Sequence, residues 1–203
     1  MIKNIIFDLG GVILDINYQK TENEFIKLGF SNFNEIYSQA KQNNFFNDFE
    51  NGKLSNDDFI HFFKDINPKI STEQIIQSWN AMLLDLKVEK LNQIKELSKK
   101  YDLFLLSNTN AIHVEAFESY IDRNFNINKF KGLFKTIYYS NEIGLRKPDK
   151  EVFEFVIANN NIKTENTLFI DDSPQHLIGA KSIGLKTYLH PQNELLNYKK
   201  IGI

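Results

Sequence analysis

The sequence predicts an α/β fold in which a Rossmann-like parallel sheet carries an inserted all-helical cap. Short apolar runs that end in polar or glycine-rich turns alternate with helix-length segments, as in buried βαβ units. A long segment after the first of these runs has its hydrophobic residues at helical spacing. The 203 residues are 42% hydrophobic and 13% aromatic, which is enough to bury a sizeable core.

The elements of the core follow from this alternation. Five apolar runs are expected to be strands, at residues 2–7, 102–106, 136–139, 167–170 and 185–189. The segments between and after the later runs are expected to be helices, at residues 89–100, 112–121, 150–159 and 174–183. Ser107 is a candidate N-cap for the second of these helices, and Pro148 can open the third at its first position.

The cap is expected at residues 16–85, which leaves 1–15 and 86–203 as the Rossmann-like core. Within the cap, hydrophobic residues such as Phe59 and Phe63 recur at helical spacing, and no convincing strand is present. A segment inserted after the first strand lies at the carboxyl ends of the strands, where doubly wound sheets bind ligands. The cap is therefore a candidate lid over a site.

The composition excludes several classes of function. The 24 basic and 26 acidic residues give a net charge of −2, which argues against nucleic acid or an anionic membrane as partner. Cysteine is absent, which excludes disulfides, thiol catalysis and cysteine metal sites. The apolar run at the N-terminus meets Asp8 too early for an export signal or a membrane span, so a cytoplasmic location is expected. The oligomeric state is not predicted.

Polar residues follow the first two predicted strands. Asp8 ends the first strand and is followed by Gly10 and Gly11, which allow a tight turn and a close approach of the backbone to a ligand. Ser107 and Asn108 end the second strand, where a hydroxyl and backbone N–H groups can bind an anion. Taken singly, each pattern is explained as well by a turn or a helix cap.

Two further motifs carry charge. Lys147 directly precedes Pro148, which favours an extended conformation at the lysine. Asp171 and Asp172 end the strand at 167–170, and adjacent carboxylates at the end of a buried strand repel each other unless a cation offsets the charge. Magnesium prefers such oxygen ligands. The carboxyl ends of parallel strands converge on one crevice, where these groups would suit phosphoryl transfer through an aspartyl-phosphate.

In order and spacing, the segments 7–15, 105–110, 144–148 and 169–173 resemble the four motifs of the haloacid dehalogenase-like (HAD) hydrolase superfamily, in its helical-cap branch. The resemblance covers essentially the whole chain. Within the superfamily, the chain looks most similar to the subgroup that contains bacterial α-glucose-1-phosphate phosphatase. It implies a magnesium-dependent hydrolase of a small phosphomonoester, such as a sugar phosphate.

The resemblance also implies roles for individual residues. Asp8 would be the nucleophile that becomes phosphorylated. Ser107 and the backbone N–H of Asn108 would bind phosphoryl oxygens, and Lys147 would neutralise charge on Asp8 and the phosphate.

For the metal, the resemblance implies Asp8, the Gly10 carbonyl and Asp172 as direct ligands of Mg²⁺, with Asp171 acting through water. The order within the acidic pair is left open by the sequence.

The chain departs from the common family pattern at Gly10, where most phosphatases of the superfamily have a second aspartate as general acid and base. Such assistance is worth about 10²–10⁴-fold in rate. Asp15 is one candidate for a replacement, and turn capping explains it equally well. A cap side chain or water is another candidate. The cap turns at 43–46 and 50–52 could contact the leaving group, whereas Trp79 is expected in the helical core.

Two alternatives remain beside the phosphatase. Haloacid dehalogenases of the superfamily also lack the second aspartate and need no metal, but they do not normally keep an acidic pair such as Asp171-Asp172. A non-catalytic phosphate-binding or regulatory module would be expected to have lost Asp8, Lys147 or the acidic pair, and all are present.

Overall fold

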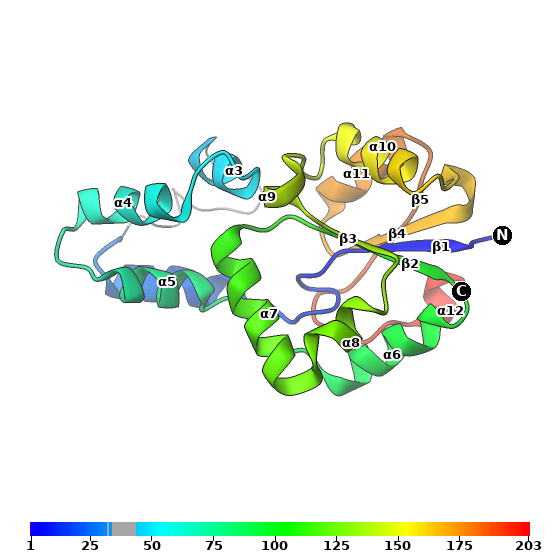
Figure 1. Cartoon of the computed structure of the whole chain (residues 1–203), viewed down its shortest axis with the longest axis horizontal. Coiled ribbons are helices and arrows are strands. Elements are labelled where there is room, and N and C mark those ends of the chain that lie inside the picture. The colour runs from blue at the N-terminus through cyan, green and yellow to red at the C-terminus, as the bar shows by residue number, and fades with distance from the viewer. Residues whose placement is uncertain (32, 34–43) are drawn as a thin grey trace.

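The computed structural model describes residues 1–31, 33 and 44–203. In this part of the chain the core is a five-stranded, all-parallel sheet with strand order β3-β2-β1-β4-β5 (Figure 1). The strands are β1 (Asn4–Phe7), β2 (Asp102–Ser107), β3 (Thr136–Tyr139), β4 (Thr167–Asp171) and β5 (Lys186–Leu189). The predicted fold class and all five predicted strands are confirmed, with β1 at the centre of the sheet.

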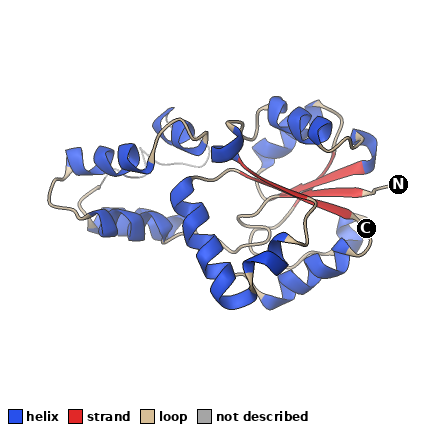
Figure 2. Ribbon diagram, viewed as in Figure 1, coloured by secondary structure: helices blue, strands red, loops and turns tan. Residues whose placement is uncertain are grey.

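Helices cover both faces of the sheet (Figure 2). One face is covered by α6 (Val88–Ser98), α7 (Ala111–Phe125) and α8 (Ile127–Lys131), and the other by α10 (Lys150–Asn159) and α11 (Pro174–Ser182). The strand side chains alternate between these layers. Ile5 and Phe7 pack with the first set of helices, while Ile6 packs with the second, and all three are fully buried. Two short helices, α9 (Ser140–Ile143) and α12 (Tyr198–Ile201), complete the core.

Four predicted helices are confirmed with small shifts of their ends, but Ser107 and Pro148 do not have the roles expected of them at the starts of two of these helices. The second helix begins at Ala111 with Asn110 as its N-cap, because the Asn110 side chain accepts from the His113 backbone N–H. Ser107 still pairs with Tyr139 in the sheet, so it cannot cap that helix. The third helix begins at Lys150, which leaves Pro148 outside it.

The described helices of the predicted cap are α1 (Tyr18–Lys27), α3 (Asn44–Glu50), α4 (Asn56–Ile66) and α5 (Thr72–Asn80). They extend away from the sheet as a separate lobe (Figure 1). The lobe buries its own aromatic cluster, in which the Phe25 and Phe33 rings stack at 4.3 Å and Trp79 stacks on Phe46 at 5.5 Å between centroids. Hydrophobic burial of this kind, at about 1.5–3 kcal/mol per large side chain, gives the lobe a core of its own.

Two paired linkers join this lobe to the sheet. The Asn17 backbone N–H donates to the Met82 carbonyl at 2.8 Å, and the Leu84 N–H donates to the Asp15 carbonyl at 2.9 Å. The Asp15 N–H in turn donates to the Asp85 carbonyl at 3.0 Å. The chain thus enters and leaves the lobe side by side. Among the described residues, no helix is both long and apolar enough to cross a membrane.

Candidate active site

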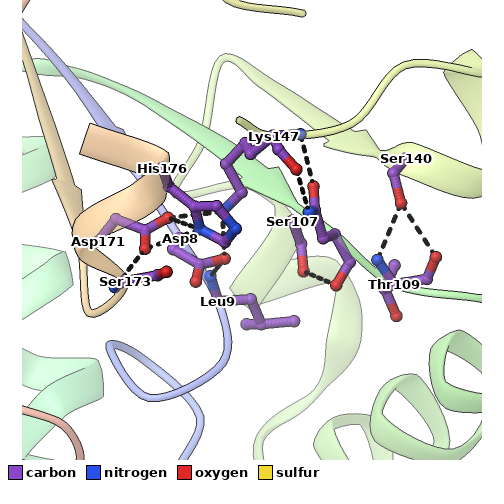
Figure 3. A network of polar contacts seen from close by, with 10 residues as sticks. Asp8, Leu9, Ser107, Thr109, Ser140, Lys147, Asp171, Ser173 and His176 are labelled. Carbon is purple, nitrogen blue, oxygen red and sulfur yellow. Dashed lines mark hydrogen bonds and ion pairs between the residues drawn. The ribbon is translucent and has the colours of Figure 1, made fainter. Parts of the chain in front are cut away.

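Four of the residues singled out in the sequence meet at the carboxyl edge of the sheet: Asp8, Ser107, Lys147 and Asp171 (Figure 3). Asp8 directly follows β1, Ser107 ends β2 and Asp171 ends β4. Lys147 reaches the same point from the segment between α9 and α10. The register explains this convergence, because Phe7 of β1 lies opposite both Leu105 and Ile170.

Lys147 is the centre of the cluster and is fully buried. Its Nζ lies 2.8 Å from Asp8 Oδ1 and 2.7 Å from Asp171 Oδ2. Burial alone would lower the pKa of Lys147, but the two carboxylates outweigh it and raise the pKa, so the side chain is charged. The Asn108 side chain holds the Lys147 backbone from both sides, donating to its carbonyl at 2.8 Å and accepting from its N–H at 2.9 Å.

The two carboxylate oxygens of Asp8 differ in their hydrogen bonds. Oδ1 accepts from Lys147 and from the Leu9 backbone N–H at 2.7 Å. Within the described residues, Oδ2 forms no such bond. Burial raises the pKa of Asp8 to about 7 against the opposing charge of Lys147, and the nearby carboxylates of Asp171 and Asp172 add to the rise.

The two carboxylates of the acidic pair differ sharply in their surroundings. Asp171 is saturated with donors: its Oδ1 accepts from the Ser173 N–H at 2.7 Å, its Oδ2 binds Lys147, and His176 Nδ1 lies 3.0 Å from both oxygens. Burial would raise its pKa, but Lys147 and His176 outweigh this and hold the pKa at about 2. For Asp172, burial and then the charge of Asp171 raise the pKa to about 6.

A divalent cation fits this donor set. Lys147 supplies one positive charge for three nearby carboxylates, those of Asp8, Asp171 and Asp172. The raised pKa values of Asp8 and Asp172 follow from burial and from this excess of negative charge, which a divalent cation would offset. The glycine turn fits as well, because Gly11 has φ +77° and a Cβ there would collide with the Asp172 carboxylate.

Distance and hydrogen bonding point to different members of the acidic pair. Ligand atoms of Asp8, Asp171 and His176 all lie within 4.8 Å of one another, and Asp172 is outside this group. However, both oxygens of Asp171 are already occupied by donors, and a histidine is a poor ligand for magnesium. The hydrogen bonds therefore favour Asp172 for direct contact with the ion, in the order that the family resemblance implies.

Asp15 lies apart from the cluster. Its two oxygens are each 2.7 Å from a lysine, Oδ1 from the buried Lys90 and Oδ2 from Lys87. It does not line the cavity that opens at Asp8. Sequence position alone placed it near the site, whereas these ion pairs tie it to the linker into the lobe.

The cavity at Asp8 has a volume of about 740 Å³, including space open to solvent, and is lined by residues of both the core and the helical lobe. The core contributes Asp8, Ser107 and Asn108 among others, the lobe contributes Tyr18, Glu50 and Trp79, and the linker contributes Met82 and Leu83. Glu50, from the turn at 50–52, is thus at the site as the sequence suggested. Trp79 is both buried in the aromatic cluster and part of the cavity wall. Phe45 and Phe46 lie in α3, and Asn43 falls outside the described residues.

His113, His176 and Arg146 line the same cavity but were not predicted. Their spacing in the sequence carries no recognisable pattern. The one available signal was their proximity to the predicted motifs.

His113 and Asn110, at the start of α7, connect the core to Trp79 of the lobe. The Asn110 amide oxygen accepts from the Trp79 indole N–H at 3.3 Å, and its Nδ2 lies 3.1 Å from His113 Nδ1. Since an amide NH₂ can only donate, Nδ1 must accept, which places the ring hydrogen on Nε2. Nε2 then donates to the Trp79 carbonyl at 3.1 Å. Burial lowers the pKa of His113 to about 4, so the ring is neutral.

This network predicts acid sensitivity. The unfolded chain takes up the proton near pH 6.5 and the native state only near pH 4, so the free energy of unfolding should decline as the pH falls between these values. The loss attributable to His113 is about 3 kcal/mol at pH 4. Urea denaturation of wild type and His113→Gln at pH 7 and pH 4 gives the free energies of unfolding. The decrease from pH 7 to pH 4 should be larger in wild type than in His113→Gln by about this amount. The exposed His61, replaced by Gln, is the control; equal pH profiles for wild type and His113→Gln would contradict the prediction.

Comparisons with known proteins agree with this site. Residues 5–189 match the family described as haloacid dehalogenase-like hydrolase. The chain is 33% identical to a D-ribitol-5-phosphate phosphatase of Bacteroides thetaiotaomicron, over 95% of this chain and 93% of that one.

Solved structures agree as well. A HAD family enzyme of Bacteroides thetaiotaomicron, crystallised with magnesium and inorganic phosphate, superposes with a TM-score of 0.86 at 30% identity, covering 98% of this chain and 99% of that chain. A predicted HAD-like family hydrolase of Porphyromonas gingivalis superposes with a TM-score of 0.85 at 31% identity, covering 98% and 94%. The narrower resemblance to the α-glucose-1-phosphate phosphatase subgroup stays a prediction. With its four motifs gathered at one edge of the sheet, the chain belongs to the haloacid dehalogenase-like hydrolase family.

Proposed function

We propose that this protein hydrolyses a small phosphomonoester through a phosphorylated Asp8, with magnesium as cofactor. The observation that carries the proposal is the buried Lys147, which binds Oδ1 of Asp8, a residue that lines the cavity and whose Oδ2 has no hydrogen bond among the described residues. The substrate class is supported by the relative that is a D-ribitol-5-phosphate phosphatase and by the similar structure that binds magnesium and inorganic phosphate.

The proposed reaction has two displacements at phosphorus. In the first, Asp8 Oδ2 attacks, the bond between phosphorus and the ester oxygen breaks, and the leaving alkoxide takes a proton. In the second, water attacks the aspartyl-phosphate, which regenerates the carboxylate and releases inorganic phosphate. Ser107, the Asn108 N–H and Lys147 hold the phosphoryl oxygens as charge develops on them.

The cofactor would be held by Asp8, the Gly10 carbonyl and Asp172, with Asp171 behind them. Magnesium bound there supplies positive charge that neutralises the phosphoryl group and the carboxylates. Asp171 has a further task that needs no metal, because its contact with Lys147 keeps the ammonium group beside Asp8.

The source of the leaving-group proton differs from the common family pattern. Gly10 has no side chain to donate one, and Asp15 would first have to leave Lys87 and Lys90. These contacts favour the remaining candidates, a cap side chain or a water molecule in the cavity.

The acidic pair separates this proposal from its alternatives. A metal-independent dehalogenase does not require the carboxylate of Asp172. Burial and the charge of Asp171 raise the pKa of this carboxylate to about 6. A binding module does not require a buried carboxylate held by a buried lysine at the wall of a cavity. The buried Lys147 and the intact pair therefore favour a magnesium-dependent phosphatase.

A panel of substrates tests the proposal. We expect turnover of D-ribitol 5-phosphate, sugar phosphates or p-nitrophenyl phosphate with Mg²⁺, measured as released phosphate. EDTA should remove the activity and excess Mg²⁺ restore it, because the carboxylates lose the cation that offsets their repulsion. Release of halide from a 2-haloacid in the presence of EDTA would instead identify a dehalogenase, and no turnover on either panel would indicate a binding module.

A further inference from the structure

The turn that follows α3 connects the helical lobe to the catalytic core on the side opposite the paired linkers. Glu50 lies at its start, and Glu50 Oε2 accepts from Arg146 Nη2 at 2.7 Å and from Arg146 Nε at 3.1 Å. The two side chains are only 13% and 16% exposed, and both line the cavity. A pair this deeply buried is screened far less by salt than one at the surface.

The same turn makes a backbone contact with the core. Gly52 has φ +68°, and a Cβ at this position would collide with the backbone carbonyl oxygen of Asn141. The turn therefore depends on glycine to approach α9 closely.

Ser140 connects this contact to the phosphate-binding loop. Its hydroxyl oxygen accepts from the Thr109 N–H at 2.9 Å and lies 3.0 Å from the Thr109 carbonyl (Figure 3). It also lies 2.7 Å from the backbone carbonyl oxygen of Glu50. A hydroxyl has a single hydrogen, so Ser140 donates to Glu50 or to Thr109 but not to both. The bond that Ser140 makes within the core thus depends on whether Glu50 is in place.

Arg146 connects Glu50 to the catalytic lysine. It directly precedes Lys147, whose backbone is fixed on both sides by Asn108. Two short routes therefore run from Glu50 into the site. One passes through Arg146 to Lys147, and the other passes through Ser140 to Thr109, next to Asn108.

We propose that Glu50 is a positioning residue, which couples docking of the helical lobe to the placement of Lys147 and of the phosphate-binding loop. The lobe is then more than a lid that excludes water. Its docked state completes the arrangement in which Asp8 reacts, and undocking loosens both routes at once. This inference rests on the proposed phosphatase activity.

Steady-state kinetics on the best ester of the panel test the proposal. We expect Glu50→Gln and Arg146→Gln each to lower kcat about tenfold while KM changes less than about threefold, because positioning acts on the chemical step rather than on ground-state binding. The double variant should lose less than the product of the two single losses, since both substitutions remove the contact between Glu50 and Arg146. Asp48→Asn is the matched control, because Asp48 lies on the same helix as Glu50 and forms an exposed ion pair with Lys53.

Three results would overturn the proposal. The first is a kcat for Glu50→Gln within twofold of that of Asp48→Asn. The second is a rise in KM with kcat unchanged. The third is a decrease in kcat for the double variant that equals the product of the two single decreases. If Glu50→Gln fails to fold, Ser140→Ala breaks the second route alone and should still lower kcat.

A readout without turnover separates this inference from the proposed function. Trp79 is the single tryptophan of the chain and lies in the cavity wall, so its fluorescence can report inorganic phosphate binding. In Asp8→Asn protein, Glu50→Gln should reduce the fluorescence change that accompanies phosphate binding while the affinity for phosphate stays nearly the same, whereas Asp48→Asn should leave the fluorescence change intact. An identical response in all three would contradict the positioning role even if the wild-type enzyme is active.

Discussion

Asp8→Asn is expected to abolish hydrolysis of every ester that the wild-type protein turns over. The amide keeps the size of the side chain and can still accept from Lys147 and the Leu9 N–H, but it has no carboxylate oxygen to attack phosphorus. Removal of a nucleophile typically lowers kcat by about 10⁴-fold or more. The measurement is phosphate release with saturating Mg²⁺.

The stability of the same variant separates chemistry from folding. Burial raises the pKa of Asp8 to about 7, so near and above neutral pH the ionised carboxylate is unfavourable in the metal-free native state. Asp8→Asn should therefore unfold at the same or a higher urea concentration than wild type in EDTA. Asp102→Asn, at an exposed carboxylate paired with Lys135, is the control that should keep full activity. Retained turnover in Asp8→Asn would eliminate it as the nucleophile.

Lys147→Met is expected to remove activity and to destabilise the fold as well. Methionine fills much of the volume but leaves Asp8 and Asp171 buried without their shared cation. Loss of one partner of a buried ion pair costs about 3–5 kcal/mol. Urea denaturation in EDTA measures this loss, which should grow as the pH rises and the carboxylates ionise.

Lys135→Met provides the comparison, because Lys135 is 65% exposed and its ion pair with Asp102 is at the surface. Its effect should stay within about 0.5 kcal/mol. If Lys147→Met were as stable as Lys135→Met at pH 8, the buried cluster would not depend on the lysine charge. The assignment of Lys147 as the group that neutralises Asp8 would then fail.

The core of the site was predictable because it depends on strand ends. Asp8, Ser107 and Asp171 lie together for the same reason that Phe7 pairs with Leu105 and Ile170, and a parallel sheet makes that convergence obligatory. Apolar runs reveal such strands without any knowledge of side-chain contacts. The residues at their ends could therefore be named from sequence alone.

The contacts that depend on tertiary packing were not predictable. Asp15 follows the site closely in sequence, but Lys87 and Lys90, which come just after the insertion, pair with it. Likewise Asn110 competes with Ser107 as helix cap, and only the pairing of Ser107 with Tyr139 decides between them. Arg146 and Glu50 are 96 residues apart in the chain, and no local pattern relates them.

The paired linkers also bear on the order in which the chain can fold. Asn4 of β1 pairs with Asp102 of β2, so the central strand must find a partner across the whole insertion. The entropy cost of closing such a loop rises with its length, and long-range strand pairing is slow. Contacts between Asn17 and Met82 and between Asp15 and Leu84 bring the two ends of the insertion together. If these contacts form before β1 pairs with β2, they shorten the loop that the strand pairing has to close. Once the helical lobe has formed its own aromatic core, β1 and α6 emerge as near neighbours, and the sheet can assemble as if the insertion were a short turn.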